Sequence, residues 1–184
     1  MKKNLTYSLA LVSLFASLTA VGAFIKIPLP YVPFTLQTLF VFLAGSLLGS
    51  RRGGQSQLLY VVTGLAGLPV FTQGGGIGYV LQPTFGYLIG FVVAAFVVGL
   101  ISERVKKPKA YKFILANLAG LAVVYLVGVS YLYMALNTWM RIDTSWGQAI
   151  MVGVVYGIAG DVIISVLAGL LTMRLWKVFS SIRK

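Results

Sequence analysis

The sequence contains no cysteine and no histidine in its 184 residues. Without cysteine the chain forms no disulfide and has no thiol nucleophile, and without histidine it lacks the usual general base and the commonest transition-metal ligand. It also lacks the Gly-x-x-x-x-Gly-Lys-[Ser/Thr] loop of ATPases. These absences exclude most enzyme classes, so we expect a protein that is not an enzyme and that carries no cofactor.

Acidic residues are scarce, with three against fifteen lysines and arginines and a formal net charge of +12. In a soluble domain such a charge suggests nucleic acid as the partner. Here 59% of the residues are hydrophobic, only 10% are charged and the mean hydropathy is +0.93. A chain this apolar cannot cover a soluble surface with polar groups. We therefore expect an integral membrane protein whose surroundings are lipid, with no nucleic-acid partner.

Uncharged runs between the charged patches predict an all-α protein with six transmembrane helices. The predicted spans are 5–24, 34–49, 57–70, 81–101, 113–137 and 149–173. The longest hydrophilic stretch, 102–112, is too short to fold independently. The sequence therefore predicts one membrane domain over residues 1–184.

Basic residues gather on one face when these spans alternate across the bilayer. Only Lys26 and Arg141 lie on the other face. The positive-inside rule then places both termini in the cytoplasm. The residues of the basic face are Lys2, Lys3, Arg51, Arg52, Arg104, Lys106, Lys107, Lys109, Lys112, Arg174, Lys177, Arg183 and Lys184.

The first apolar run has a second interpretation, as a signal peptide. It follows Lys2 and Lys3 and ends in Val21-Gly22-Ala23, which is similar to a cleavage site. The run is longer than the usual signal-peptide core of about 7 to 15 residues, which favours a retained first span. Within it, Ala16 and Ala20 form a small-residue face for close helix contact, either inside the bundle or with a partner subunit.

Two irregular segments adjoin the short second and third spans. Three prolines, Pro28, Pro30 and Pro33, precede the second span, and the glycine-rich stretch 69–78 follows the third. Irregular backbone at membrane depth is tolerated where it lines a cavity or is buried by protein. We therefore predict an outward-facing pocket roofed by these loops. The glycines permit either an ordered ligand loop or a mobile connector.

Asp161 is the lone charged residue of the predicted span 149–173. A carboxylate near the middle of a bilayer is costly and is by default a ligand or ion contact. Its alternative role, a buried ion pair, needs a distant cation such as Lys26 or Arg141. Small or polar residues recur every four positions around it, which predicts a ridge that faces protein or a cavity. This ridge comprises Gly153, Gly157, Asp161, Ser165 and Gly169.

Other polar residues of the predicted spans are candidates for the same site. Thr35, Gln37 and Thr38 lie at the start of the second span, and Asn117 and Tyr125 lie in the fifth. Their side chains donate or accept hydrogen bonds. The alternative roles are helix capping for Thr35 and interhelical hydrogen bonding for Asn117 and Tyr125.

Several linked motifs resemble those of the BioY family, the biotin-specific S components of energy-coupling factor (ECF) transporters. They are Val32-Pro-Phe-Thr-Leu-Gln-Thr-Leu39, Gly67-Leu-Pro-Val-Phe71, Gly74-Gly-Gly-Ile-Gly-Tyr79, Pro83-Thr-Phe-Gly-Tyr87 and Gly160-Asp161. The resemblance implies a six-helix subunit of a bacterial plasma membrane that captures biotin outside and works with a transmembrane coupling subunit and two ATPase subunits. It also implies that the face of Ala16 and Ala20 meets the coupling subunit.

The resemblance also suggests how biotin is held. Ionised Asp161 accepts hydrogen bonds, which suits the ureido N–H groups of biotin. The remaining candidate contacts are polar groups of Thr35, Gln37, Gln73 and Asn117, walls from Tyr79 and Tyr125, and backbone N–H groups of Gly75, Gly76 and Gly78 near the biotin carboxylate. The family pattern has a lysine three residues after the aspartate, where this chain has Ile164.

Three alternatives stay open. An ion-coupled secondary transporter would use Asp161 to couple protons or sodium to uptake. An S component for another vitamin would keep the mechanism and change the ligand. An intramembrane enzyme would need paired catalytic groups, and the sequence offers Asp161 without a second buried acid, a histidine or a cysteine.

Overall fold

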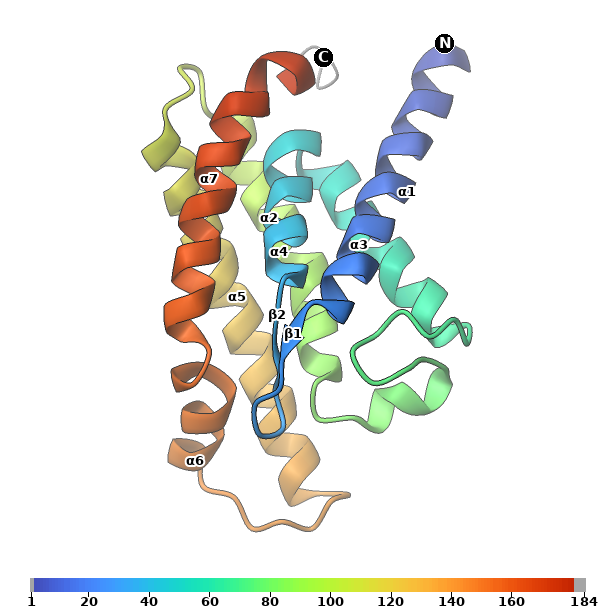
Figure 1. The fold of residues 1–184 in the computed structure, drawn as a ribbon, viewed down its shortest axis with the longest axis vertical. Coiled ribbons are helices and arrows are strands. Elements are labelled where there is room, and N and C mark those ends of the chain that lie inside the picture. Colours follow the sequence, from blue (N-terminus) through green and yellow to red (C-terminus); the bar gives the residue numbers. More distant parts are fainter. Residues whose placement is uncertain (1, 181–184) are drawn as a thin grey trace.

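The computed structural model describes residues 2–180, and the side chains of Lys2 and Lys3 as well as Arg183 and Lys184 lie outside what it describes. Helices dominate this part of the chain (Figure 1). The elements are α1 (Lys2–Phe24), β1 (Lys26–Ile27), β2 (Phe34–Thr35), α2 (Gln37–Leu48), α3 (Ser50–Leu65), the 3-10 helix η1 (Ile77–Leu81), α4 (Phe85–Glu103), α5 (Ala110–Asn137), α6 (Trp146–Ile150), the π-helix η2 (Met151–Val155) and α7 (Ile158–Ser180).

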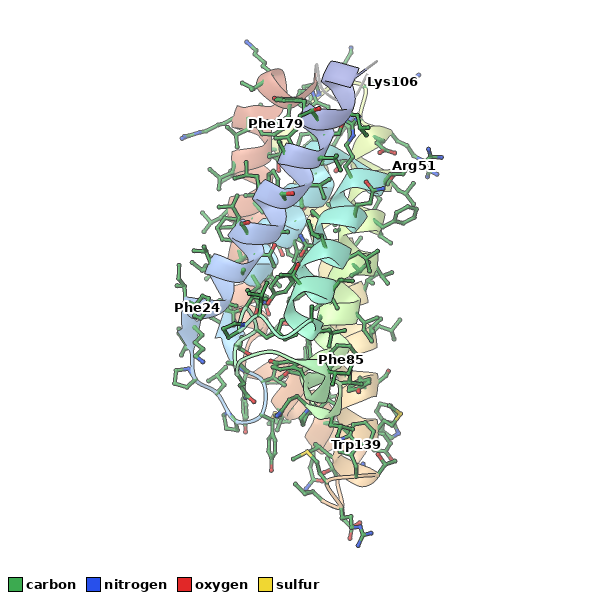
Figure 2. All side chains as sticks on the ribbon, turned by 90° about the vertical axis from the view of Figure 1, so that its right-hand side faces the viewer. Phe24, Arg51, Phe85, Lys106, Trp139 and Phe179 are labelled. Carbon is green, nitrogen blue, oxygen red and sulfur yellow. The ribbon has the colours of Figure 1, made fainter. Side chains whose placement is uncertain are left out.

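The helices form a bundle in which the start of α1 and the end of α7 lie at the same end (Figure 1). Arg51 and Lys106 lie at this end, and Trp139 lies at the opposite one (Figure 2). We call them the basic end and the far end. The connection between α4 and α5, residues 104–109, carries four of the chain's basic residues and also lies at the basic end.

Four helices of the described part are long and apolar enough to cross a membrane: Leu5–Phe24, Phe85–Glu103, Ala110–Asn137 and Ile158–Phe179. They correspond to the predicted first, fourth, fifth and sixth spans. The helix α2 is apolar but has only 12 residues, or ~18 Å. The prediction of a membrane-embedded helical protein is therefore confirmed, while the count of six transmembrane helices stays a prediction.

The predicted third span, 57–70, was wrong at both ends. The helix α3 begins at Ser50, immediately after the turn at Gly49, and ends at Leu65. Gly49 has a φ of 87°, a conformation that favours glycine, and it lets the chain reverse between α2 and α3. The Glu103 carboxylate accepts a 2.7 Å hydrogen bond from the Ser50 backbone N–H, which caps the new helix. Arg51 and Arg52 therefore belong to a helix and not to a loop.

The predicted fourth span began too early. Residues 77–81 form the separate 3-10 helix η1, and α4 starts at Phe85. Gln82 between them is extended, with φ −73° and ψ 137°. The proline at position 83 explains the break, because a residue before proline avoids the helical region.

The predicted sixth span, 149–173, is not one continuous helix. It comprises α6, η2 and most of α7, with a turn at Tyr156 and Gly157. The Tyr156 N–H donates to the Met151 carbonyl at 3.3 Å, five residues back, so the chain is wider here than in an α-helix. Asp161 consequently lies in the first turn of α7. Breaks of this kind inside membrane proteins are tolerated where neighbouring protein satisfies the backbone.

The irregular segments that the sequence predicts beside α2 and α3 are ordered. The first is a hairpin in which β1 pairs antiparallel with β2, with Lys26 opposite Thr35. In the second, a short bridge joins Phe71 to Gly74, and the Gly76 N–H donates to the Gly64 carbonyl at 2.7 Å. Both segments lie below the helices α1 to α3 in the view of Figure 1.

Close helix contacts in the bundle depend on glycines. A Cβ at Gly53 of α3 would lie 2.8 Å from the Gly45 Cα of α2. At the next position, a Cβ at Gly54 would lie 3.6 Å from its nearest neighbour, an ordinary contact with Phe96. Gly53 therefore sets the distance between α2 and α3, whereas Gly54 does not.

Substituting these two glycines tests that packing. Gly53→Ala is expected to lower the free energy of unfolding by about 1–3 kcal/mol, because the methyl group forces two backbones apart. Gly54→Ala is expected to leave it unchanged or raise it by up to about 1 kcal/mol through helix propensity. Thermal unfolding of both variants in detergent measures the difference, and equal stability would contradict the assigned contact.

Candidate ligand site

A cavity lies where α2, α4, α5 and the broken last segment meet the two ordered loops. Its empty volume, including the open mouth, is about 640 Å³. Its lining is mostly apolar or hydroxyl-bearing. The lining residues are Val32, Pro33, Phe34, Thr35, Gln37, Thr38, Thr72, Tyr79, Thr84, Tyr87, Leu88, Phe91, Val124, Tyr125, Val152, Gly153, Gly157 and Asp161.

Asp161 supplies the only carboxylate of this lining and is 9% exposed. The Tyr125 hydroxyl of α5 donates to its Oδ2 at 2.6 Å, and the Thr38 hydroxyl of α2 donates to its Oδ1 at 3.1 Å. Both partners are neutral hydroxyls, so neither brings a positive charge to the carboxyl group. Each oxygen retains acceptor capacity for a ligand N–H group.

The break before α7 contributes to this site. Because α7 begins at Ile158, the Asp161 carboxylate lies in the first helical turn, where the positive end of the helix dipole favours a negative charge. Gly157 leaves space beside it, since a Cβ there would lie 3.6 Å from Asp161 Oδ2. Ile164, at the position of the family lysine, is 4% exposed and belongs to the apolar core.

Gln37 lines the cavity, but its amide is held by protein. The Thr35 hydroxyl donates to Gln37 Oε1 at 3.0 Å, and Gln37 Nε2 donates to the Tyr60 hydroxyl at 2.8 Å. Tyr60 in turn donates to the Val70 carbonyl at 3.0 Å. This series of hydrogen bonds fixes the start of α2 to α3 and to the glycine-rich segment, so Thr35 and Gln37 shape the wall of the cavity.

Tyr79 brings hydroxyl groups to the opposite part of the lining. Its own hydroxyl lies 3.0 Å from the Thr72 hydroxyl and 3.3 Å from the Thr84 hydroxyl. The sequence predicts Tyr79 as an apolar wall, and the structure adds a cluster of three hydroxyls that can donate to a ligand anion.

The two loops above the cavity are joined to each other. The Lys26 ammonium, at the start of the hairpin, donates to the Thr72 carbonyl at 2.5 Å. Phe34 of the hairpin reaches α7, because Gly160 has no side chain at the place where the Phe34 ring lies. Phe34 of the hairpin and Thr72 of the glycine-rich segment both line the cavity. The Lys26 contact therefore joins the two segments that cover it.

The structure places the loop residues that were predicted as ligand contacts outside the lining of the cavity. Gln73, Gly75 and Gly78 are exposed and do not line the cavity, nor does Gly76. The Gly76 N–H is used by the Gly64 carbonyl, and a Cβ at Gly75 would meet the Leu68 and Gly64 carbonyls. Gly75 and Gly76 therefore allow the loop to fold tightly on the end of α3, and the Gly76 N–H is not available to a ligand.

Two further sequence predictions give way to packing roles. Asn117 is fully buried outside the cavity lining, where it accepts from the Ser46 hydroxyl at 3.2 Å and donates to the Ser165 carbonyl at 3.0 Å. It thus joins α2, α5 and α7, the three helices that hold the Asp161 carboxylate. Ala16 is 7% exposed in the core and Ala20 packs against that core, so their face contacts other helices of this chain. A contact of this face with a coupling subunit stays a prediction.

Sequence reasoning omitted several lining residues. Thr84 and Tyr87 belong to the motif Pro83-Thr-Phe-Gly-Tyr87, and Thr72 lies in the glycine-rich stretch 69–78. Tyr87 donates to the Gly153 carbonyl at 2.9 Å, which holds η2 beside α4. Their places in this motif and in this stretch were the available signal. The apolar residues Leu88, Phe91 and Val124 carry no such signal, because they do not differ from lipid-facing residues of the same helices. Within residues 2–180 no cluster of acids suits a metal ion.

Comparison with known proteins identifies the family to which this chain belongs. The model of the BioY family matches residues 1–181. The chain belongs to the BioY family. A relative from Lysinibacillus sphaericus, a probable biotin transporter BioY, is 58% identical over 183 residues, which cover 100% of this chain and 93% of the relative. The biotin transporter BioY of Thermotoga maritima is 41% identical over 165 residues, or 89% of this chain and 92% of that protein.

A solved structure also matches the fold of this BioY family member. It is the crystal structure of the S-component for biotin from an ECF-type ABC transporter, with a TM-score of 0.80 and 28% sequence identity. The match covers 95% of this chain and 91% of that one. The two chains therefore share one fold over nearly their whole length.

Replacing Asn117 tests whether its hydrogen bonds between helices stabilise the fold. Asn117→Ala is expected to lower the free energy of unfolding by about 1–2 kcal/mol, because the Ser165 carbonyl and the Ser46 hydroxyl each lose a partner. Ser130→Ala, which removes an exposed hydroxyl bonded only to its own helix, is the matched control and is expected to change it by less than about 0.5 kcal/mol. Thermal unfolding in detergent compares them.

Proposed function

We propose that this chain is the biotin-binding S component of an ECF-type transporter. The single observation that carries the proposal is the buried Asp161 carboxylate, held by two neutral hydroxyls in the lining of a cavity. Relatives and a solved structure with biotin in their names share the fold that builds it. The role is transport, and no chemistry is done on the ligand.

The chemistry of biotin matches the two parts of the lining. Its ureido ring has two N–H groups, which the Asp161 carboxylate accepts in charge-assisted hydrogen bonds. The sulfur ring and the aliphatic chain are apolar and contact Leu88, Phe91 and Val124. The biotin carboxylate then lies towards the hydroxyls of Thr72, Tyr79 and Thr84, which replace the glycine N–H groups predicted from the sequence.

The orientation in the membrane follows from the charge distribution. The basic end faces the cytoplasm by the positive-inside rule, so both chain termini are cytoplasmic and the cavity opens outward. In this arrangement α1, α4, α5 and the α6–η2–α7 segment cross the bilayer fully. The short helices α2 and α3 form the remaining two of six membrane segments, and the two ordered loops complete their outer ends.

Delivery of biotin inward requires an energy source outside this chain. The sequence has no phosphate-binding loop, so partner subunits supply ATP hydrolysis through a transmembrane coupling subunit. We propose that this partner module consists of the coupling subunit and two ATPase subunits. An ion-coupled transporter is the second candidate, favoured by the unpaired charge of Asp161 in the membrane.

Replacing Asp161 tests the ligand site. Asp161→Asn keeps the size of the side chain but replaces one acceptor oxygen by a donor, so biotin affinity is expected to fall at least about tenfold, a loss of 1.4 kcal/mol or more. Asp143→Asn is the control, because Asp143 is exposed outside the cavity. Calorimetric titration of both with biotin, and with thiamin and riboflavin as comparison ligands, measures the effect. Unchanged biotin affinity in Asp161→Asn would rule out the assigned contact.

Uptake assays distinguish the two energy sources. Cells that express the chain with an ECF module are expected to accumulate labelled biotin, and a catalytically inactive ATPase subunit is expected to stop this accumulation. Dissipating the proton and sodium gradients at constant ATP is expected to leave it unchanged. Loss of accumulation with the gradients, at full ATP, would favour the ion-coupled transporter.

A further inference from the structure

At the break in the last segment, a side chain from another helix bonds a backbone carbonyl. In a regular α-helix the Gly153 carbonyl would accept from the N–H of Gly157, four residues later. Here the Gly157 N–H donates to the Val154 carbonyl at 3.0 Å instead. The Gly153 carbonyl accepts from the Tyr87 hydroxyl of α4 at 2.9 Å. Tyr87 therefore takes the place of the backbone donor where the helix is interrupted.

Two glycines make room for the Tyr87 side chain. A Cβ at Gly128 of α5 would lie 2.5 Å from Tyr87 Cδ1, and a Cβ at Gly153 would lie 2.5 Å from the Tyr87 hydroxyl oxygen. Both distances are too short for two atoms that are not bonded to each other. Tyr87 is also 7% exposed, so its ring is enclosed by protein. The side chain thus acts as a spacer that sets how far η2 lies from α4.

The direction of the Asp161 carboxylate depends on this break. The Asp161 N–H donates to the Gly157 carbonyl at 3.0 Å, in the first turn of α7. A π-turn contains one residue more than an α-turn, so closing it would rotate the chain that follows by roughly 100°. Such a rotation would turn the carboxylate away from Thr38 and Tyr125, its two hydrogen-bond donors. The π-turn therefore has to persist for Asp161 to line the cavity.

The Tyr87 hydroxyl has one hydrogen, and the Gly153 carbonyl accepts it. Although Tyr87 lines the cavity, its hydroxyl consequently has no donor left for a ligand. Its contribution to binding has to come through the backbone that it holds.

From these contacts we infer that Tyr87 is a positioning residue for biotin binding. The inference rests on the proposed function, because it concerns the same ligand and the same cavity. By bonding the Gly153 carbonyl, Tyr87 holds the π-turn in place, and the π-turn directs the Asp161 carboxylate into the cavity. Tyr87 thus affects the ligand through Asp161 and not by its own contact.

Removing one oxygen tests this role. Tyr87→Phe keeps the ring between the two glycines, while the Gly153 carbonyl loses its donor. Biotin affinity, measured by calorimetric titration, is expected to fall about three- to tenfold, the equivalent of one hydrogen bond. Tyr131→Phe is the matched control, because the Tyr131 hydroxyl also donates to a backbone carbonyl, that of Val80, but Tyr131 does not line the cavity. The control is expected to change the affinity less than about twofold.

A double-variant cycle separates positioning from direct contact. When Tyr87→Phe is added to Asp161→Asn, the affinity is expected to fall less than about twofold further, because the residue through which Tyr87 acts is already altered. A direct contact between Tyr87 and biotin, or a general loss of folding, would add the full loss of about three- to tenfold again.

Gly153→Ala tests the same contact from the other side. Its Cβ would meet the Tyr87 hydroxyl, so the variant is expected to lower biotin affinity at least about threefold. Adding Tyr87→Phe removes the atom that this Cβ meets and is expected to cause no further loss. Gly147→Ala in α6 is the control, because a Cβ there would lie 3.9 Å from its nearest neighbour, and it is expected to leave the affinity unchanged.

Hydrogen–deuterium exchange of the ligand-free chain measures the π-turn itself. Tyr87→Phe is expected to speed exchange of the Tyr156 and Gly157 N–H groups about three- to tenfold, because local opening becomes easier. Exchange in the first half of α5 is expected to stay unchanged, which reports that the rest of the fold is intact. Tyr131→Phe is expected to leave exchange of these two N–H groups unchanged.

Three results would overturn the inference. Unchanged biotin affinity in Tyr87→Phe would show that the hydroxyl is not needed for binding. A full further loss in the Asp161→Asn background would make Tyr87 a direct contact. Unchanged exchange at Tyr156 and Gly157 would show that the π-turn persists without the Tyr87 hydroxyl. Failure of biotin to bind the unsubstituted chain would contradict the proposed function, while the exchange measurement would still test whether Tyr87 holds the π-turn.

Discussion

The burial of one carboxylate among membrane helices is the constraint on which the rest of the structure depends. Asp161 is satisfied by Thr38 of α2 and Tyr125 of α5, so three helices must keep a fixed distance at this point. Asn117 joins the same three helices nearer the basic end. Together these contacts hold the bundle around the cavity, and a carboxylate that would be costly in lipid becomes a preformed acceptor.

Irregular backbone supplies the space that regular helices would fill. A continuous helix over the last span would close the region around Gly157, whereas the π-turn and the break displace the chain and start α7 beside the cavity. The proline hairpin precedes α2, and the glycine-rich segment follows α3. Their mutual contact through Lys26 and Thr72 covers the site with ordered chain. The cavity therefore results from where the helices stop.

The buried polar side chains outside the cavity form hydrogen bonds that hold the helices together. Buried in lipid, an amide or hydroxyl without a partner is costly, so Gln37, Tyr60 and Asn117 are bonded to protein. Such residues have the same composition signal as ligand contacts. For this reason the sequence predicted both Asn117 and the glycine-rich segment as parts of the site, while the structure assigns them to helix contacts and to the loop's own fold.

The sequence alone determined the membrane class, the concentration of basic residues at one end, the importance of Asp161 and the family. These follow from composition, from charge placement and from linked motifs, which are properties of residues read in order. The tertiary structure decided that Thr72, Thr84 and Tyr87 share a cavity with Asp161, that α3 begins at Ser50, and that the last span is broken. Partners more than a hundred residues apart, such as Thr38 and Asp161, meet only through the packing of helices, and no local pattern encodes that meeting.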